Sequence, residues 1–156
     1  MSETILRAKD LRTVLHGAGA PVRAVDGVDI EIRRGETFAI VGESGSGKTM
    51  TALSLMRLLP ETGRIVSGTV ELSGTDLLAL PEAAMRTVRG RRIAMIFQEP
   101  ATSLNPVLTV GTQIREVLER HTDLRGAQIG ERVLSLLDSV GVPDAGRRAE
   151  EYPFQL

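Results

Sequence analysis

The 156-residue sequence predicts an α/β fold in which antiparallel strands come first, a strand–loop–helix unit follows, and helices make up the last third. Residues 22–32 alternate between apolar and polar side chains, as in a strand with one buried face. Two short, almost continuously apolar runs, at 37–41 and 93–97, are typical of strands buried on both faces of a parallel sheet. Beyond residue 109, apolar side chains recur at helical spacing.

The N-terminal elements follow from turn signals between these patterns. A first strand is expected at 5–15, and the Gly- and Pro-containing loop 17–21 separates it from the alternating strand. A helix is expected from residue 48 until Pro60 ends it. A strand at 65–72 and a short helix at 81–88 precede the second apolar run.

Two amphipathic helices are expected in the last third, each with one apolar stripe. Their stripes consist of Val110, Ile114, Val117, Leu118 and His121, and of Ile129, Val133, Leu136, Leu137 and Val140. Gly141 and Pro143 supply the stop signal of the second helix. Together these helices predict a separate helical unit.

Composition excludes several classes of protein. Apolar residues make up 42% and charged residues 25% of the chain, as in ordinary globular proteins rather than disordered ones. A net charge of -1 and an aromatic content of 3% predict no nucleic-acid partner. There is no cysteine, so disulfides, thiolate zinc sites and a cysteine nucleophile are excluded. No secretory signal or membrane-spanning run is visible, which predicts a cytoplasmic protein.

Residues 42–49 match the pattern G-x-x-x-x-G-K-[ST] in full. The glycines let successive backbone N–H groups converge on phosphate oxygens, and the following helix directs its positive end at the same charge. Lys48 is expected on the β- and γ-phosphates of a nucleotide, and the Thr49 hydroxyl on Mg²⁺. The apolar run before the loop and the helix after it complete the context, so the sequence predicts nucleotide binding.

Gln98 is a second candidate, because it follows the apolar run that ends at Phe97. A neutral amide at the end of a strand beside a phosphate loop is able to coordinate Mg²⁺ or to orient the attacking water. From the residues alone, an ordinary strand-end glutamine is the more economical interpretation.

The 42–49 loop, the 98–106 stretch and the helices after it resemble the ATP-binding subunit of ABC transporters. The 98–106 stretch and residues 152–156 are similar to the importer subfamily for di- and oligopeptides and nickel. The resemblance covers essentially the whole chain. It implies a P-loop NTPase core with an antiparallel β subdomain in residues 1–98, and a Q-loop with part of a helical subdomain in 99–156. The intact protein would be an ATPase that couples MgATP binding and hydrolysis to solute uptake.

The resemblance also assigns roles to residues. Lys48 and Gln98 take catalytic roles, and Thr49 and Gln98 hold Mg²⁺, with Gln98 as the Q-loop residue that senses the γ-phosphate. The residues expected to contact ATP are Gly42, Glu43, Ser44, Gly45, Ser46, Gly47, Lys48, Thr49 and Met50. The expected partners are transmembrane permease subunits, a second ATP-binding subunit and, indirectly, an extracytoplasmic solute-binding protein. The expected location is therefore the inner face of the cell membrane.

Two features depart from the family pattern. The adenine-stacking aromatic residue upstream of the loop is missing, and Val22, Arg23 or, less favoured, His16 is expected near that position. The sequence ends at Leu156, where family members continue with Ser-Gly-Gly and later supply a catalytic glutamate and a switch histidine. We expect an N-terminal part of the domain that is poorly stable alone and binds nucleotide without turnover.

Two other functions share the 42–49 loop. A non-transport ABC-type ATPase, such as one acting in DNA repair, would lack the 102–106 sequence. A small P-loop kinase would need a lid, for which 86–92 is the only arginine-rich candidate. Phosphorylation of a small acceptor would identify the kinase, and association with a membrane subunit would identify the transporter.

Overall fold

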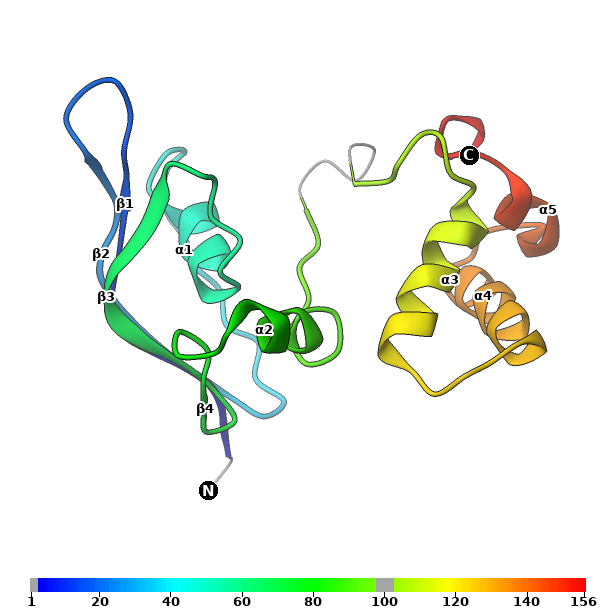
Figure 1. Ribbon diagram of the computed structural model, residues 1–156, viewed down its shortest axis with the longest axis horizontal. Coiled ribbons are helices and arrows are strands. Elements are labelled where there is room, and N and C mark those ends of the chain that lie inside the picture. Colours follow the sequence, from blue (N-terminus) through cyan, green and yellow to red (C-terminus); the bar gives the residue numbers. More distant parts are fainter. Residues whose placement is uncertain (1–2, 98–102) are drawn as a thin grey trace. The chain divides into compact units, whose positions relative to one another are not determined.

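The computed structural model describes residues 3–97 and 103–156. The chain divides into two compact units, Met1–Met85 and Arg86–Leu156 (Figure 1). The first unit carries a sheet and a helix, and the second is helical. The expected boundary between residues 98 and 99 stays a prediction, because both positions lie outside the described residues.

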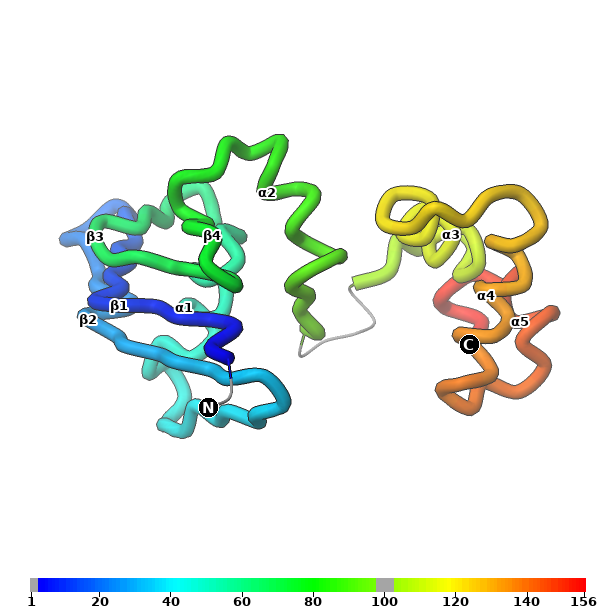
Figure 2. The backbone as a smooth tube through the Cα atoms, turned by 90° about the horizontal axis from the view of Figure 1, so that it is seen from below, coloured from blue at the N-terminus to red at the C-terminus, as the bar shows by residue number. Residues whose placement is uncertain are grey.

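The sheet of the first unit is antiparallel, and its strands lie in the order β2-β1-β3-β4 (Figure 2). Their bounds are Thr4–Leu15 for β1, Val22–Arg33 for β2, Gly63–Leu72 for β3 and Thr75–Asp76 for β4. Leu11 of the central strand and Val70 of β3 are completely buried in the core of this unit. The three long strands confirm the alternation and turn signals of the sequence.

Helix α1 (Lys48–Leu55) ends earlier than the expected stop at Pro60. The next residues reverse the chain, with Arg57 in the left-handed region at φ 53°. The Leu58 N–H donates to the Leu53 carbonyl at 2.8 Å, and the Arg57 N–H to the Ser54 carbonyl at 3.0 Å. This pair of hydrogen bonds is the Schellman arrangement that closes a helix, normally around a glycine.

Arg57 also holds the chain between β4 and helix α2 (Glu82–Val88). Its guanidinium donates to the carbonyl oxygens of Leu77 at 2.9 Å and Leu80 at 2.6 Å. The same side chain therefore closes α1 and fixes a segment about twenty residues further along the sequence.

The two apolar runs expected as buried strands are not strands in the structure, so that prediction is wrong at both places. Val41 is 92% exposed and Ile96 is 95% exposed. Ile93 makes only an isolated bridge with Arg89. A strand of a parallel sheet forms no hydrogen bonds within itself and needs neighbours to complete its ladder. Within the described ranges, the sheet consists of β1 to β4 and offers neither run such a neighbour.

The helical unit has one hydrophobic core. Its elements are α3 (Val110–His121), α4 (Ala127–Ser139), α5 (Ala145–Glu150) and the short 3-10 helix η2 (Pro153–Gln155). The buried residues shared by α3, α4 and α5 are Val110, Leu118, Ile129, Val133, Leu137, Ala145 and Ala149. Both predicted stripes are confirmed except at Val117 and Val140, which are 54% and 75% exposed. The sequence pattern missed α5, which is too short for a helical period.

Candidate functional site

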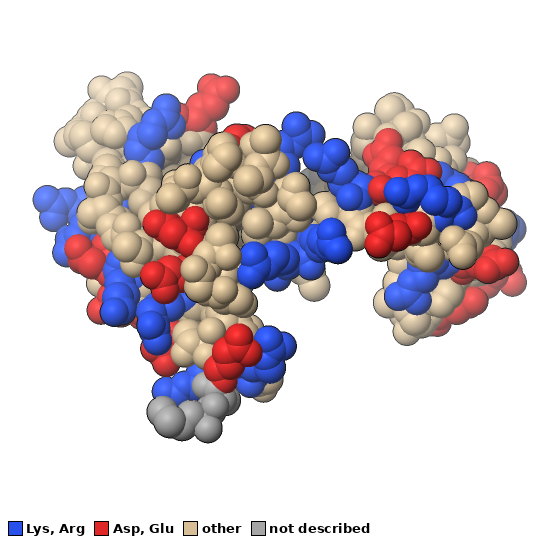
Figure 3. Space-filling view, turned by 60° about the horizontal axis from the view of Figure 1, so that its bottom comes forward, with Lys and Arg blue, Asp and Glu red and all other residues tan. Residues whose placement is uncertain are grey.

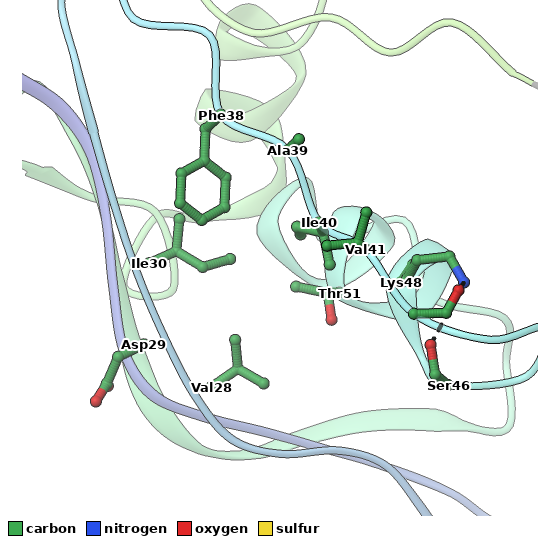
Figure 4. A pocket seen from close by; sticks show the side chains of 11 residues that line it. Val28, Asp29, Ile30, Phe38, Ala39, Ile40, Val41, Ser46, Lys48 and Thr51 are labelled. Atoms are coloured by element: carbon green, nitrogen blue, oxygen red, sulfur yellow. Dashed lines mark hydrogen bonds between the residues drawn. The ribbon is translucent and has the colours of Figure 1, made fainter.

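The glycine-rich loop, residues 42–47, lies directly before α1 in the first unit (Figure 4). Gly47 caps the helix with φ 90° and ψ 3°, a left-handed conformation that disfavours any side chain. A Cβ at Gly47 would lie 2.2 Å from the carbonyl oxygen of Ala24 on β2. The loop therefore touches the sheet backbone to backbone, which fixes the point where α1 begins.

Lys48 is the first residue of α1, and its ammonium group turns back over the loop. The Nζ atom donates to the carbonyl oxygens of Gly42 at 2.8 Å and Glu43 at 2.6 Å, with the Ser46 Oγ at 3.4 Å (Figure 4). The free N–H groups at the start of a helix carry partial positive charge. The ammonium and the helix N-terminus thus concentrate positive charge at one small concave place, which suits a phosphate.

The hydroxyl groups of the first turn of α1 have different surroundings. Thr51 is buried and donates its hydroxyl to the Gly47 carbonyl at 3.0 Å, so it stabilises the helix start. Thr49 is exposed to solvent at the same end of the helix. Thr49 therefore supplies an oxygen that a ligand at the loop is able to reach.

Helix α1 is tied to the central strand by two completely buried hydroxyl groups. Thr13 on β1 and Ser54 on α1 lie 2.7 Å apart, oxygen to oxygen. The Ser54 hydroxyl donates to the Met50 carbonyl at 2.6 Å, so its proton is used and Thr13 is the donor of the pair. Sequence reasoning missed both residues, although a threonine between apolar neighbours two positions away is a signal of a buried hydroxyl.

A cleft of about 390 Å³ adjoins the loop, within the size range of small-molecule sites (Figure 4). It lies between β2 and the segment before the loop, and only its loop end is basic. Its lining residues are Val28, Asp29, Ile30, Phe38, Ala39, Ile40, Val41, Gly42, Ser46, Lys48 and Thr51. The apolar run at 37–41, which the sequence predicted as a buried strand, forms one wall of this cleft instead.

The structure brings together most of the residues that the sequence singled out. The nine expected nucleotide contacts, residues 42–50, form the loop and the first turn of α1. Gln98 lies outside the described residues, so its predicted metal and catalytic roles stay predictions. Glu43 is exposed on the loop.

The candidates for an adenine contact lie near the turn between β1 and β2. His16, Val22 and Arg23 are all exposed. The His16 N–H donates to the Thr62 carbonyl at 2.9 Å, and Arg23 pairs with Asp26 at 3.5 Å. Contact of any of them with a base stays a prediction.

Charged side chains of both signs are interspersed over the face seen in Figure 3. On the sheet, a hydrogen bond from Arg7 lowers the pKa of Glu31, and a hydrogen bond to Asp10 raises the pKa of Arg12. Residues 3–97 and 103–156 contain no group of three His, Asp or Glu side chains placed to hold a metal. Their helices also include none with the length and apolar character needed to cross a bilayer.

Relatives with assigned names match the chain along nearly all its length. A protein named as a peptide import ATP-binding protein of Brucella ovis is 50% identical over 160 positions, covering 99% of this chain and 47% of that protein. The oligopeptide transport ATP-binding protein AppD of Bacillus subtilis is 45% identical, covering 98% of this chain and 47% of that protein. The chain thus spans about half the length of these relatives.

Solved structures show the same fold. The ATP-binding cassette MJ0796, in a dimeric post-hydrolysis state bound to ADP and Pi, has a TM-score of 0.83 at 23% identity, covering 97% of this chain and 63% of that chain. CbiO1 of Clostridium perfringens, part of the ABC transporter complex cbiONQ, has a TM-score of 0.70 at 20% identity, covering 99% and 56%. These likenesses confirm the predicted α/β class with an antiparallel sheet and a helical part.

A family model described as ABC transporter matches residues 25–156. The matched span takes in nearly all of β2, the glycine-rich loop and every helix of the described residues. The chain belongs to the ABC transporter family.

Proposed function

We propose that the glycine-rich loop and the first turn of α1 bind the phosphates of ATP. The observation that carries the proposal is the position of Lys48, whose ammonium group lies within 2.8 Å of the Gly42 and Glu43 carbonyl oxygens at the N-terminus of a helix. An incoming phosphate offers this ammonium a negatively charged acceptor in place of neutral carbonyls, and charge-assisted hydrogen bonds are the stronger kind. The backbone N–H groups of residues 47–49, at the N-terminus of α1, would bind the remaining phosphate oxygens.

Mg²⁺ would bind beside the phosphates. Thr49 fits this role because its exposed hydroxyl oxygen, a hard ligand, lies in the first turn of α1 next to Lys48. Mg²⁺ retains water and phosphate oxygens among its ligands, so the loop needs to supply few of its own. Gln98 would supply a second oxygen, and the bound ion would neutralise the charge that develops on the phosphates.

The whole protein would hydrolyse ATP to drive the import of peptides or a related solute. The names of the relatives support this proposal, since they describe peptide import and oligopeptide transport. Lys48 would stabilise the transferring γ-phosphoryl group by positioning and charge, and Gln98 would orient the attacking water.

The proposed partners are two kinds of subunit. Transmembrane permease subunits would bind the helical unit, and a second ATP-binding subunit would complete the nucleotide site. The dimeric state of MJ0796 and the membership of CbiO1 in a transporter complex support this arrangement. A solute-binding protein outside the membrane would deliver the solute, and the ATP-binding subunit would lie on the cytoplasmic face.

The two lysines of the chain, Lys9 and Lys48, provide a matched test. Lys48→Ala should raise the Kd for MgATP, measured by isothermal titration calorimetry, by at least about tenfold, since it removes a charge-assisted contact. Lys9 is exposed on β1, and Lys9→Ala should leave the Kd within about twofold of the original value. Equal affinity of the Lys48→Ala protein and the unchanged chain would refute the proposed phosphate site.

A further inference from the structure

Another cavity of the first unit lies where the chain passes from α1 into β3 (Figure 1). Its volume is about 470 Å³, somewhat larger than the cleft beside the glycine-rich loop. Two arginines line it, Arg57 after α1 and Arg64 on β3, together with the carboxylate of Glu61. The cavity and the cleft have no lining residue in common, so the cavity is separate from the proposed phosphate site.

The first arginine, Arg57, is held at the wall of the cavity by carbonyl oxygens. Its Nη1 donates to the Leu77 carbonyl at 2.9 Å and to the Leu80 carbonyl at 2.6 Å, and its side chain is only 24% exposed. Its Nη2 lies 3.8 Å from the Glu82 Oε2, and Glu82 is 59% exposed. An ion pair that is open to water on one side contributes little, so a ligand with a closer and drier oxyanion competes well for this group.

The second arginine, Arg64, is held in the same manner at the start of β3. Its Nη1 donates to the Glu61 carbonyl at 2.8 Å and to the Gly63 carbonyl at 2.7 Å. The turn that supplies these carbonyls is itself closed, because the Gly63 N–H donates to the Pro60 carbonyl at 2.8 Å. Within residues 3–97 and 103–156, the Nε and Nη2 atoms of Arg64 have no hydrogen-bond partner. These donors are therefore available to a ligand.

The remaining side chains at the cavity are mostly aliphatic. Leu59, Ile65 and Leu78 line it, and each is half-buried. Small-molecule sites commonly combine an apolar wall with a few fixed polar groups. A guanidinium group is planar and offers parallel N–H donors, which match the oxygens of a carboxylate or a phosphate. Two such groups on one apolar cavity favour an anion that also has an apolar part.

We propose that this cavity binds a small organic anion whose carboxylate or phosphate group contacts Arg57 and Arg64. The apolar part of the ligand lies against the three aliphatic side chains of the wall. Glu61 is exposed among the lining residues, and its charge opposes the anion. The site is independent of the proposed ATP site, because the two are built from different residues.

The first experiment titrates the full-length protein with benzoate, which joins one carboxylate to an apolar ring. The amide chemical shifts of Gly63 and Leu78, followed by NMR, should change saturably with a Kd of about 1 mM or lower. Benzamide has nearly the same shape without the charge, and it should leave both shifts unchanged. Phenyl phosphate places a phosphate on the same ring, and the tighter of the two anions identifies the class of ligand. If neither anion moves the two amides, or if benzamide binds as well as benzoate, the proposal is wrong.

Three charge variants test which residues hold the anion. Arg64→Gln should raise the Kd for benzoate at least about fivefold, because it removes a charge-assisted contact. Arg34→Gln is the matched control, since Arg34 is an exposed arginine of the same unit outside the cavity, and its Kd should stay within about twofold. Glu61→Gln removes the opposing charge and should lower the Kd. Equal affinities of the Arg64→Gln and Arg34→Gln proteins, or weaker binding after Glu61→Gln, would overturn the proposal.

A comparison within the same spectra separates a site from general attraction of anions to arginine. At constant ionic strength, the amide of Gly35, next to Arg34 and outside the cavity, should not move with benzoate. Shifts of equal size at Gly35 and Gly63 would show unspecific attraction and refute the site. The outcome leaves the proposed function untouched, because the Lys48→Ala test concerns the other end of α1.

Discussion

The buried hydrogen bond between Thr13 and Ser54 links the central strand to the helix that starts at the glycine-rich loop. We predict that this bond is strongly coupled in a double-mutant cycle made of Thr13→Val, Ser54→Ala and the double variant. Both side chains are fully buried, and the Ser54 proton is used by the Met50 carbonyl. The two single changes therefore leave different groups without a partner.

The expected free energies follow from what each change leaves behind. Thr13→Val removes the donor and leaves Ser54 with one unused lone pair, at a cost of about 1 kcal/mol. Ser54→Ala leaves the Thr13 O–H buried without an acceptor, at a cost of about 1–3 kcal/mol. The double variant removes both polar groups, so it should lose only about 1 kcal/mol, clearly less than the sum of the single changes. The coupling free energy should then be about 1–3 kcal/mol.

Amide hydrogen exchange in β1, together with urea unfolding followed by far-ultraviolet circular dichroism, measures the stability of the unit that contains the bond. Fluorescence is unsuited, because the chain has no tryptophan and Tyr152 lies in the other unit. If the sum of the stability losses of the two single variants equals the loss of the double variant within about 0.5 kcal/mol, the assigned direction and importance of the bond are wrong.

Three further predictions concern the same unit. Gly47→Ala should lower the free energy of unfolding of this unit by about 3 kcal/mol or more in urea, because the added Cβ would lie 2.2 Å from a carbonyl oxygen of β2. Gly45→Ala is the control, because Gly45 has φ 82° and open space where the Cβ would be added, and it should lose only about 1 kcal/mol. Equal losses in the two variants would disprove the steric argument. Arg57→Gly should relieve about 1 kcal/mol of left-handed backbone strain but remove the two guanidinium hydrogen bonds, so the free energy of unfolding should fall by about 1–3 kcal/mol. A rise in melting temperature would contradict this balance. Arg7 lowers the pKa of Glu31 in the folded protein, so the Arg7–Glu31 ion pair should stabilise the fold fully above the ordinary glutamate pKa and lose this effect as pH falls through the folded pKa. Glu31→Gln should therefore flatten the dependence of the melting temperature on pH. An unchanged slope would count against the ion pair.

The sequence predicted elements whose signals are local. The alternation in β2 and the stripe in α4 each depend on residues within one element, and both appear in the structure at nearly the expected bounds. The early end of α1 was missed, because Arg57 takes a left-handed conformation that sequence rules reserve for glycine or asparagine. Its guanidinium bonds to the Leu77 and Leu80 carbonyls offset that strain, and no local pattern reveals such distant acceptors.

At the candidate site, too, the features within one stretch of sequence were predictable and the contacts between distant residues were not. Residues 42–49 were predictable, because phosphate binding requires fixed residue types within one contiguous stretch. The contacts that hold this stretch were not predictable in the same way. The closeness of Gly47 to the Ala24 carbonyl and the pairing of Thr13 with Ser54 join residues 23 and 41 positions apart, and each of these residues is unremarkable in its own segment.

The apolar run at 37–41 shows why a pattern of composition is weaker evidence than a pattern of spacing. Alternation in a strand specifies a conformation as well as a buried face, because only a period of two places alternate residues together. A continuous apolar run specifies only that the residues favour burial, and its conformation depends on what covers it. In this structure Phe38 and Ile40 line the cleft beside the loop but are 43% and 44% exposed, and Val41 is 92% exposed, so the run is not buried as its composition favours. The conformation of such a run depends on the segments that pack against it. A strand is therefore predicted there only when the segments that would pair with it are also identified.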